Sequence, residues 1–100
     1  MLLMIESFAD KATEDIFNGV NSTAARRLLP RDLWKAAFRK LDQIDSAVTL
    51  DDLRIPPGNR LEALKADREG QHSNQINDQY RICFEWTQSG ADQVEIVDYH

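Results

Sequence analysis

The sequence lacks the features that would place it in several broad classes of protein. Its one cysteine, Cys83, excludes an internal disulfide and fits a reducing cytoplasm. No apolar run approaches the roughly 18 residues that a membrane-spanning helix needs. None of the four glycines forms a Gly-x-Gly phosphate loop, and the two histidines, His72 and His100, form no metal-binding motif. The sequence therefore predicts no metal, no cofactor and no membrane segment.

Basic and acidic residues are unevenly distributed along the chain. The 100 residues, which we expect to form a single domain over 1–100, carry a net charge of −5, whereas simple nucleic-acid binders are usually basic. Four basic and two acidic residues lie in 54–68, while 85–98 holds four acidic residues and no lysine or arginine. This segregation leaves room for a local cationic site.

Two amphipathic segments in the first half predict helices. The first covers 10–18 and stops at Asn18-Gly19. The second opens at Pro30, and its apolar positions fall on one stripe: Leu33, Trp34, Ala37, Phe38, Leu41 and Ile44. Its other face is basic, which indicates either contact with nucleic acid or a solvated surface. Residues 20–29 are expected to be a connector, and 49–53 a short helical turn.

The other segments predict strands. We expect strands at 2–8, 61–65, 72–76, 80–86 and around 94–97, the clearest being the alternation of Tyr80, Ile82 and Phe84 with Arg81 and Cys83. Short turns between consecutive strands favour antiparallel pairing. The predicted fold class is α+β, with two N-terminal helices packed on a small antiparallel sheet of three to four strands in two layers. Cys83 is expected to be a buried apolar side chain.

Polar residues near the predicted turns and strand ends are candidates for chemistry. They are Arg60, Glu62, Lys65, Arg68, Arg81, Asp98, Tyr99 and His100. Such groups can cut RNA without a metal, because a base activates the 2′-hydroxyl, cations stabilise the phosphorane and an acid protonates the leaving oxygen. Simpler explanations remain open: an ordinary strand end, a solvated turn, or a strand arginine that is paired with a carboxylate.

Four segments of the sequence resemble the HigB toxins of the RelE/ParE superfamily, also called plasmid-maintenance-system killer proteins. The segments are MIESF at 4–8, LRIPPGNRLEALK at 53–65 with DREG at 67–70, INDQYRICF at 76–84, and VEIVDYH at 94–100. They are spread from residue 4 to residue 100, so the resemblance covers nearly the whole chain, and the middle block and the terminal Asp-Tyr-His are its most specific parts.

The resemblance implies a RelE-like fold and a ribosome-dependent endoribonuclease that cuts mRNA in the decoding site of the small subunit. It also implies a cognate HigA-like antitoxin with a helix-turn-helix domain. That antitoxin neutralises the toxin, and the complex represses its own operon, so operator DNA is contacted only through the antitoxin. We expect such a toxin to act in the cytoplasm.

The resemblance also implies roles for single residues. Lys65 matches a basic residue near the scissile phosphate, and Arg81 matches a strand arginine that contacts phosphate. Asp98, Tyr99 and His100 match a C-terminal polar trio, in which His100 transfers a proton and Tyr99 stacks on or positions a base.

Further positions carry lesser or altered roles. Arg60 and Arg68 are candidates for contacts with the RNA backbone. Glu62 stands where some family members have a catalytic histidine, so the base is either this carboxylate or His100.

Two other functions remain open. The acidic charge and Glu62 fit a catalytically weak or inactive toxin-like protein that only binds its antitoxin and tunes transcription of the operon. The same polar set would also suit a metal-free hydrolase of a small phosphorylated substrate.

Overall fold

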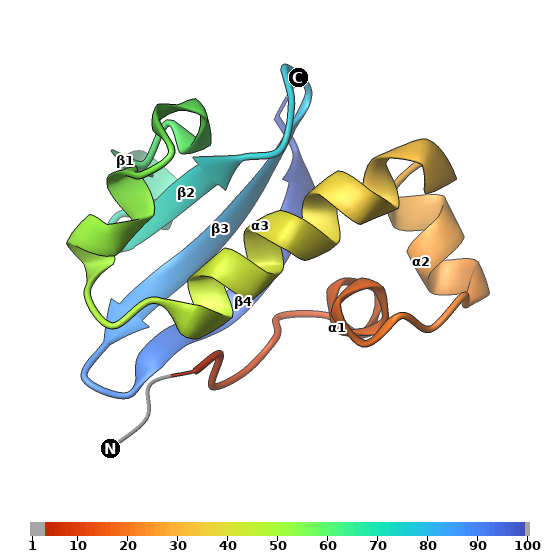
Figure 1. The fold of residues 1–100 in the computed structure, drawn as a ribbon, viewed down its shortest axis with the longest axis horizontal. Coiled ribbons are helices and arrows are strands. Elements are labelled where there is room, and N and C mark those ends of the chain that lie inside the picture. Colours follow the sequence, from red (N-terminus) through yellow and green to blue (C-terminus); the bar gives the residue numbers. More distant parts are fainter. Residues whose placement is uncertain (1–3, 100) are drawn as a thin grey trace.

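The chain folds into helices that lie against a four-stranded antiparallel sheet (Figure 1). The computed structural model describes residues 4–99. Its α-helices and strands are α1 Lys11–Asn18, α2 Thr23–Leu28, α3 Trp34–Ser46, β1 Glu62–Ala63, β2 Gln71–Gln75, β3 Tyr80–Thr87 and β4 Gly90–Asp98. Short 3-10 helices lie between them: η1 Arg31–Leu33, η2 Leu50–Arg54, η3 Pro57–Asn59 and η4 Ala66–Arg68.

The sheet has the strand order β1-β2-β3-β4, and every neighbouring pair is antiparallel. Helix α3 crosses one face of this sheet (Figure 1). Apolar side chains from both sides form one core between them: Ile16, Leu29, Leu41 and Ile44 from the helical half, and Ile82, Phe84 and Ile96 from the strands. The α+β prediction with an antiparallel sheet is confirmed.

The first helix has the predicted boundaries because both ends are capped. The Asp10 carboxylate accepts a hydrogen bond from the Thr13 amide at 2.7 Å, which satisfies a free N–H group of the first turn. Gly19 then adopts φ 74°, a left-handed conformation that glycine takes at little cost and that ends the helix.

The prediction of a connector at 20–29 is wrong, because residues 23–28 form α2. The Ser22 hydroxyl accepts a hydrogen bond from the Ala25 amide at 3.1 Å and donates one to Asp15 of α1 at 2.7 Å. The serine therefore caps α2 and joins it to α1. The short segment has too few turns for helical periodicity to be read from the sequence.

Helix α3 follows the turn η1 and buries Ala37, Leu41 and Ile44, as its apolar stripe predicts. Phe38 is the exception, because it remains 45% exposed. Its ring stacks on Phe17 with 5.9 Å between centroids, and Phe17 in turn contacts Phe8 at 5.7 Å. The stripe is thus wider than the surface that the sheet can cover.

Two of the predicted strands are shorter than expected. In the described part of 2–8, only Phe8 forms a bridge, which is parallel to Val94 of β4, while the Ile5 amide turns away to the carboxylate of Asp45. Leu2 and Leu3 lie outside the described residues. The strand expected at 61–65 contracts to β1, since η4 begins at Ala66.

The last strand is longer than expected and begins at Gly90. This glycine has φ 119°, and a Cβ atom there would stand 2.1 Å from the Met4 carbonyl oxygen. The turn between β3 and β4 is thus confined to Gln88 and Ser89.

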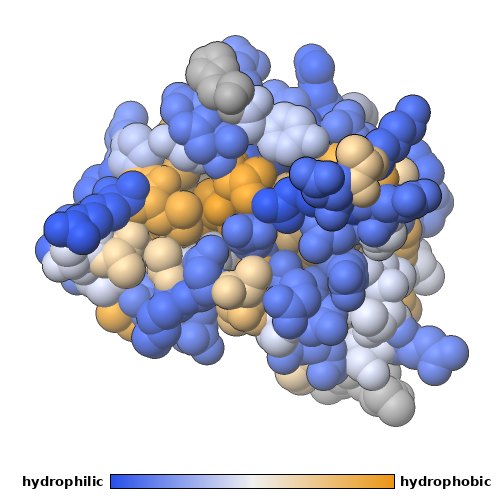
Figure 2. Space-filling view, turned by 180° about the vertical axis from the view of Figure 1, so that it is seen from behind, coloured by the Kyte–Doolittle hydropathy of each residue, from blue (hydrophilic) through white to orange (hydrophobic). Residues whose placement is uncertain are grey.

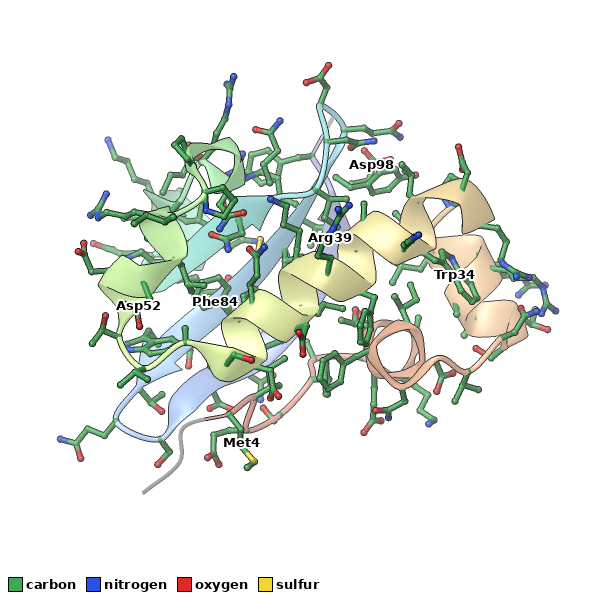
Figure 3. All side chains as sticks on the ribbon, in the orientation of Figure 1. Met4, Trp34, Arg39, Asp52, Phe84 and Asp98 are labelled. Carbon is green, nitrogen blue, oxygen red and sulfur yellow. The ribbon has the colours of Figure 1, made fainter. Side chains whose placement is uncertain are left out.

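The side of the sheet away from α3 carries the polar strand residues. Phe84 lies on the side that α3 covers (Figure 3), and side chains alternate along a strand, so Arg81 and Cys83 lie on the opposite side. Figure 2 shows this view from behind, where hydrophilic side chains surround an apolar patch. Among the described residues, no helix is long and apolar enough to cross a membrane.

Candidate functional site

The strand register places several predicted residues together on the side of the sheet away from α3. Glu62 lies opposite Ser73, which lies opposite Cys83, and Gln75 lies opposite Arg81 in the neighbouring row. Directly opposed residues share a face of the sheet. Side chains from β1, β2 and β3 therefore share the face of the sheet that carries Arg81.

The Arg81 side chain is buried and is held only by uncharged oxygen atoms. The residue is 8% exposed. Its Nε donates to the Ser73 hydroxyl at 2.7 Å, its Nη2 to the Arg60 carbonyl at 2.7 Å, and its Nη1 to the Gln75 amide oxygen at 3.4 Å. Within residues 4–99 it makes no ion pair with a carboxylate. Among these residues its positive charge is oriented but not neutralised, an arrangement suited to an incoming anion.

Tyr99 lies next to this guanidinium. Its ring centroid is 5.6 Å from Arg81 Cζ, within the range of a cation–π contact. The Tyr99 amide donates to the Gln79 carbonyl at 2.7 Å, which fixes the backbone, yet the residue remains 47% exposed. Part of the ring is thus free to meet a planar group from solvent.

A groove with a volume of about 500 Å³ opens beside Tyr99. Its lining residues are Glu62, Ala63, Leu64, Lys65 and Tyr99. The structure therefore brings Glu62, Lys65 and Tyr99 to one groove, with Arg81 in contact with the tyrosine at its edge. A second hollow of about 240 Å³ lies between α3 and η2 and contains none of the predicted residues.

The C-terminal trio does not lie on one side of the sheet. Asp98 pairs with Tyr80, whose side chain belongs to the core beneath the helices, so Asp98 lies toward that side (Figure 3). Its carboxylate accepts a hydrogen bond from the Gln79 amide nitrogen at 3.1 Å. Tyr99 instead contacts Arg81. His100 lies outside the described residues, so its role remains a prediction.

The two other predicted arginines behave differently from Arg81. Arg68 forms an ion pair with Glu95 at 3.1 Å, so its charge is balanced within the protein. Arg60 has an exposed side chain and a left-handed backbone with φ 45°. Its carbonyl oxygen, rather than its guanidinium, is what it contributes to Arg81.

Cys83 is fully buried, as predicted. Burial is the main reason that the pKa of its thiol is raised, so the thiol form persists at neutral pH. This environment suits a small apolar side chain and not a nucleophile.

Sequence reasoning missed the side chains that hold Arg81. Ser73 and Gln75 were expected only as part of a strand at 72–76. Their spacing of two residues puts both on one face of β2, next to a strand that carries an arginine on the same face. An alternation of polar residues beside a strand arginine is the signal that could have found them.

A second cationic region lies on the helices. It consists of five exposed side chains, which we call the helical basic surface: Arg26, Arg27, Arg31, Lys35 and Arg39. None of them forms an ion pair within the described part of the chain.

Two arginines of the helical basic surface are held by uncharged groups. Arg31 lies over the ring of Trp34 with Cζ 4.8 Å from the centroid, at the end of α3 that adjoins α2 (Figure 3). Arg26 donates to the Asn21 side-chain oxygen at 2.8 Å. Both contacts orient a guanidinium group without neutralising its charge.

Comparisons with known proteins point to one family. The family model for the RelE-like HigB toxins of type II toxin-antitoxin systems matches residues 6–100. The chain is 40% identical to Toxin HigB-1 of Vibrio cholerae over 88 residues, which are 88% of this chain and 90% of that protein. It is 38% identical to an uncharacterised protein of Haemophilus influenzae over 58 residues, covering 58% and 57% of the two chains.

Proposed function

Because the chain belongs to the family of RelE-like HigB toxins, we propose that it is a ribosome-dependent endoribonuclease that inhibits translation by cutting mRNA. The observation that supports this most directly is the Arg81 guanidinium, which is buried among neutral acceptors beside a groove lined by Glu62, Lys65 and Tyr99. A fixed, unbalanced cation next to an open groove is what recognition of one phosphate requires.

The reaction we propose is an attack of the ribose 2′-oxygen on the adjacent phosphorus. A base removes the 2′-hydroxyl proton, the P–O5′ bond breaks, and an acid gives a proton to the leaving 5′-oxygen. The products are a 2′,3′-cyclic phosphate and a 5′-hydroxyl. Arg81 and Lys65 stabilise the negative charge of the phosphorane, which is greater in the transition state than in the substrate.

Proton transfer is assigned to Glu62 and His100. Glu62 is exposed in the groove beside Lys65, where a carboxylate can accept a proton. His100 would return a proton to the leaving oxygen, a role that histidine side chains commonly take near neutral pH. Tyr99 would stack on a base, since its ring is half exposed and backed by a cation.

The partners follow from the same proposal. Membership of a toxin-antitoxin family implies an antitoxin. We propose that this antitoxin is HigA-like, with a helix-turn-helix domain that alone contacts operator DNA. The RNA substrate is mRNA in the decoding site of the small ribosomal subunit, in the cytoplasm.

A second candidate function is a toxin-like protein without cleavage, which binds the antitoxin and regulates the operon. Glu62 in place of a family histidine and the net charge of −5 favour it. Both candidates require an antitoxin, so only cleavage activity separates them.

The test is induced expression in a bacterial host, with wild type beside His100→Ala and Arg81→Ala. We expect wild type to arrest growth and cleave translated mRNA, and both variants to permit growth. Wild-type cells that grow with intact mRNA, at equal amounts of folded protein, would instead support the binding-only function. Cleavage of a free dinucleotide without ribosomes would indicate a hydrolase of small phosphodiesters.

A further inference from the structure

The turn that precedes β1 is fixed from within by one buried side chain. Asn59 is fully buried, although asparagine is a polar residue. Its amide nitrogen donates to the carbonyl oxygen of Leu53 at 3.1 Å and approaches that of Ile55 at 3.4 Å. The side chain therefore joins the end of the turn 56–59 to the segment before it.

Lys40 of α3 completes this arrangement. Its ammonium group donates to the Asn59 side-chain oxygen. Burial, and secondarily the charge of Arg39, lower the pKa of Lys40. Lysine is rarely placed where it loses solvent unless it gains a defined contact. Here the contact connects the helix that covers one face of the sheet to the turn that leads to the other face.

Arg60, the next residue, connects this turn to the groove through its contact with Arg81. Arg60 is in the left-handed region with φ 45° and ψ 54°, and its amide donates to the Pro57 carbonyl at 3.1 Å. An arginine in this conformation is held there by its surroundings, because the left-handed region is unfavourable for a residue with a Cβ atom. The Arg60 carbonyl oxygen then accepts the 2.7 Å hydrogen bond from Arg81 Nη2.

We propose that Asn59 is a positioning residue for the Arg81 guanidinium: with Lys40 it fixes the turn 56–59, so that Arg60 presents its carbonyl oxygen to Arg81. This inference deepens the proposed function, on which it rests for the role of Arg81 as a phosphate ligand. Ser73 and Gln75 hold the guanidinium from β2, and the Arg60 carbonyl oxygen holds it from the turn.

The test compares Asn59→Ala with a matched control, Thr13→Val. Thr13 is also fully buried, and its hydroxyl accepts a hydrogen bond from the Ile96 amide at 3.1 Å, remote from the groove. Both changes remove a buried hydrogen bond, so both should lower thermal stability. NMR of the Arg81 Nε–Hε group reports its position, and titration with a trinucleotide RNA carrying a 2′-deoxy sugar at the cleavage position reports binding without cleavage.

We expect Asn59→Ala to shift the Arg81 resonance and weaken trinucleotide binding about tenfold, which corresponds to about 1.4 kcal/mol. Thr13→Val should leave both readouts at wild-type values. Lys40→Met keeps the asparagine and should change both readouts in the same direction by less, and it serves if Asn59→Ala does not fold. An unshifted resonance in the folded variants, or equal changes in the Thr13 control, would overturn the proposal.

Arg81→Ala separates this inference from the proposed function. If it leaves trinucleotide binding unchanged, Arg81 is not the phosphate ligand and the proposed function loses its main support. The Arg81 resonance in the Asn59 variant would still show whether the turn positions the guanidinium.

Discussion

The groove on the sheet and the helical basic surface carry positive charge in opposite ways. In the groove, Lys65 shares the lining with Glu62, and the Arg81 guanidinium beside it is buried and fixed by uncharged oxygens of Ser73, Gln75 and Arg60. On the helices, all five cations are exposed, and among the described residues only Arg26 and Arg31 make side-chain contacts that orient them. One region is therefore suited to hold a single phosphate, and the other to attract many.

This difference fits the action on RNA that we propose for an acidic chain. A net charge of −5 opposes association with RNA, whereas the five exposed cations of the helical basic surface, which form no ion pair among the described residues, create a local attraction. Attraction of that kind is lost in salt, while a buried guanidinium is screened much less. The comparison predicts that variants of the groove lose catalysis, and that variants of the helices lose binding.

The largest expected effect is that of Arg81→Ala. Removal of the fixed cation should lower the cleavage rate of ribosome-bound mRNA roughly 100- to 1,000-fold, because the charge is stabilised more in the transition state than in the substrate. Single-turnover cleavage of mRNA in programmed ribosomes measures the rate. Arg81→Lys should recover only part of it, since lysine cannot make the bonds to Ser73, Gln75 and Arg60 together.

Arg68→Ala provides the control for Arg81→Ala. Both variants remove one arginine charge from the same face of the sheet, but Arg68 is balanced by Glu95. We expect the Arg68 variant to cleave at close to the wild-type rate. Equal losses in the two variants would show that total charge, and not the fixed guanidinium, determines the rate.

The fold was predictable where a local pattern is decisive. The helices at 10–18 and from Pro30 were predicted by caps and apolar spacing, and β3 by its period-2 alternation. Helix α2 was not, because six residues contain too few turns and its stability depends on the Ser22 contact with Asp15 in another helix. The length of β1 was overestimated, because pairing with β2 ends before the backbone enters η4.

The second expected effect concerns the helical basic surface. Arg31→Glu with Arg39→Glu should weaken binding to ribosomes roughly 10- to 100-fold and reduce the slope of log affinity against log salt by about two, since two cations are reversed. Equilibrium binding at several potassium chloride concentrations measures both quantities. The rate of cleavage at saturating ribosomes should change little.

Position is tested by a matched pair of single variants, Arg39→Glu and Arg54→Glu. Both arginines are exposed, and Arg54 lies in η2 with Asp51 as its partner. Each change lowers net charge by the same amount, yet we expect only the Arg39 variant to weaken binding. Identical losses of affinity in the two variants would mean that net charge alone governs association and that the helical basic surface is not a binding site.

The third expected effect is that of Lys65→Ala. Lys65 lines the groove but is exposed, so its charge is better solvated than that of Arg81. We expect cleavage to slow by about tenfold, less than for Arg81→Ala, because an exposed cation stabilises a nearby charge less than a buried one. The affinity for ribosomes should stay at the wild-type value, in contrast to the Arg39 variant. A loss of affinity with an unchanged rate would place Lys65 with the binding surface instead.

The candidate site was only partly predictable from the sequence. Lys65, Tyr99 and Arg81 came from the resemblance, and the structure brings them together. The sequence could not show that Arg68 is neutralised by Glu95, because that pair depends on contact between η4 and β4. It also could not show that Arg60 acts through its carbonyl oxygen, since this depends on a left-handed backbone inside a turn.

The smallest expected effect belongs to the scaffold that both regions share. His72 of β2 lies on the side of the sheet toward the helices, its ring stacked against Phe84 at 6.4 Å, and its Nδ1 is buried without a hydrogen-bond partner among the described residues. Burial, and secondarily the charge of Arg54, lower the pKa of His72. The unfolded chain therefore binds a proton more readily than the folded one, so stability is complete above the usual histidine pKa near 6.5 and falls as the pH drops below it.

We expect His72→Phe to reduce this acid-side loss, measured as the difference between the unfolding free energies at pH 7.5 and pH 5.5, while Arg81→Ala leaves that difference unchanged. An equal acid-side loss in wild type and His72→Phe would assign the loss to the carboxylates.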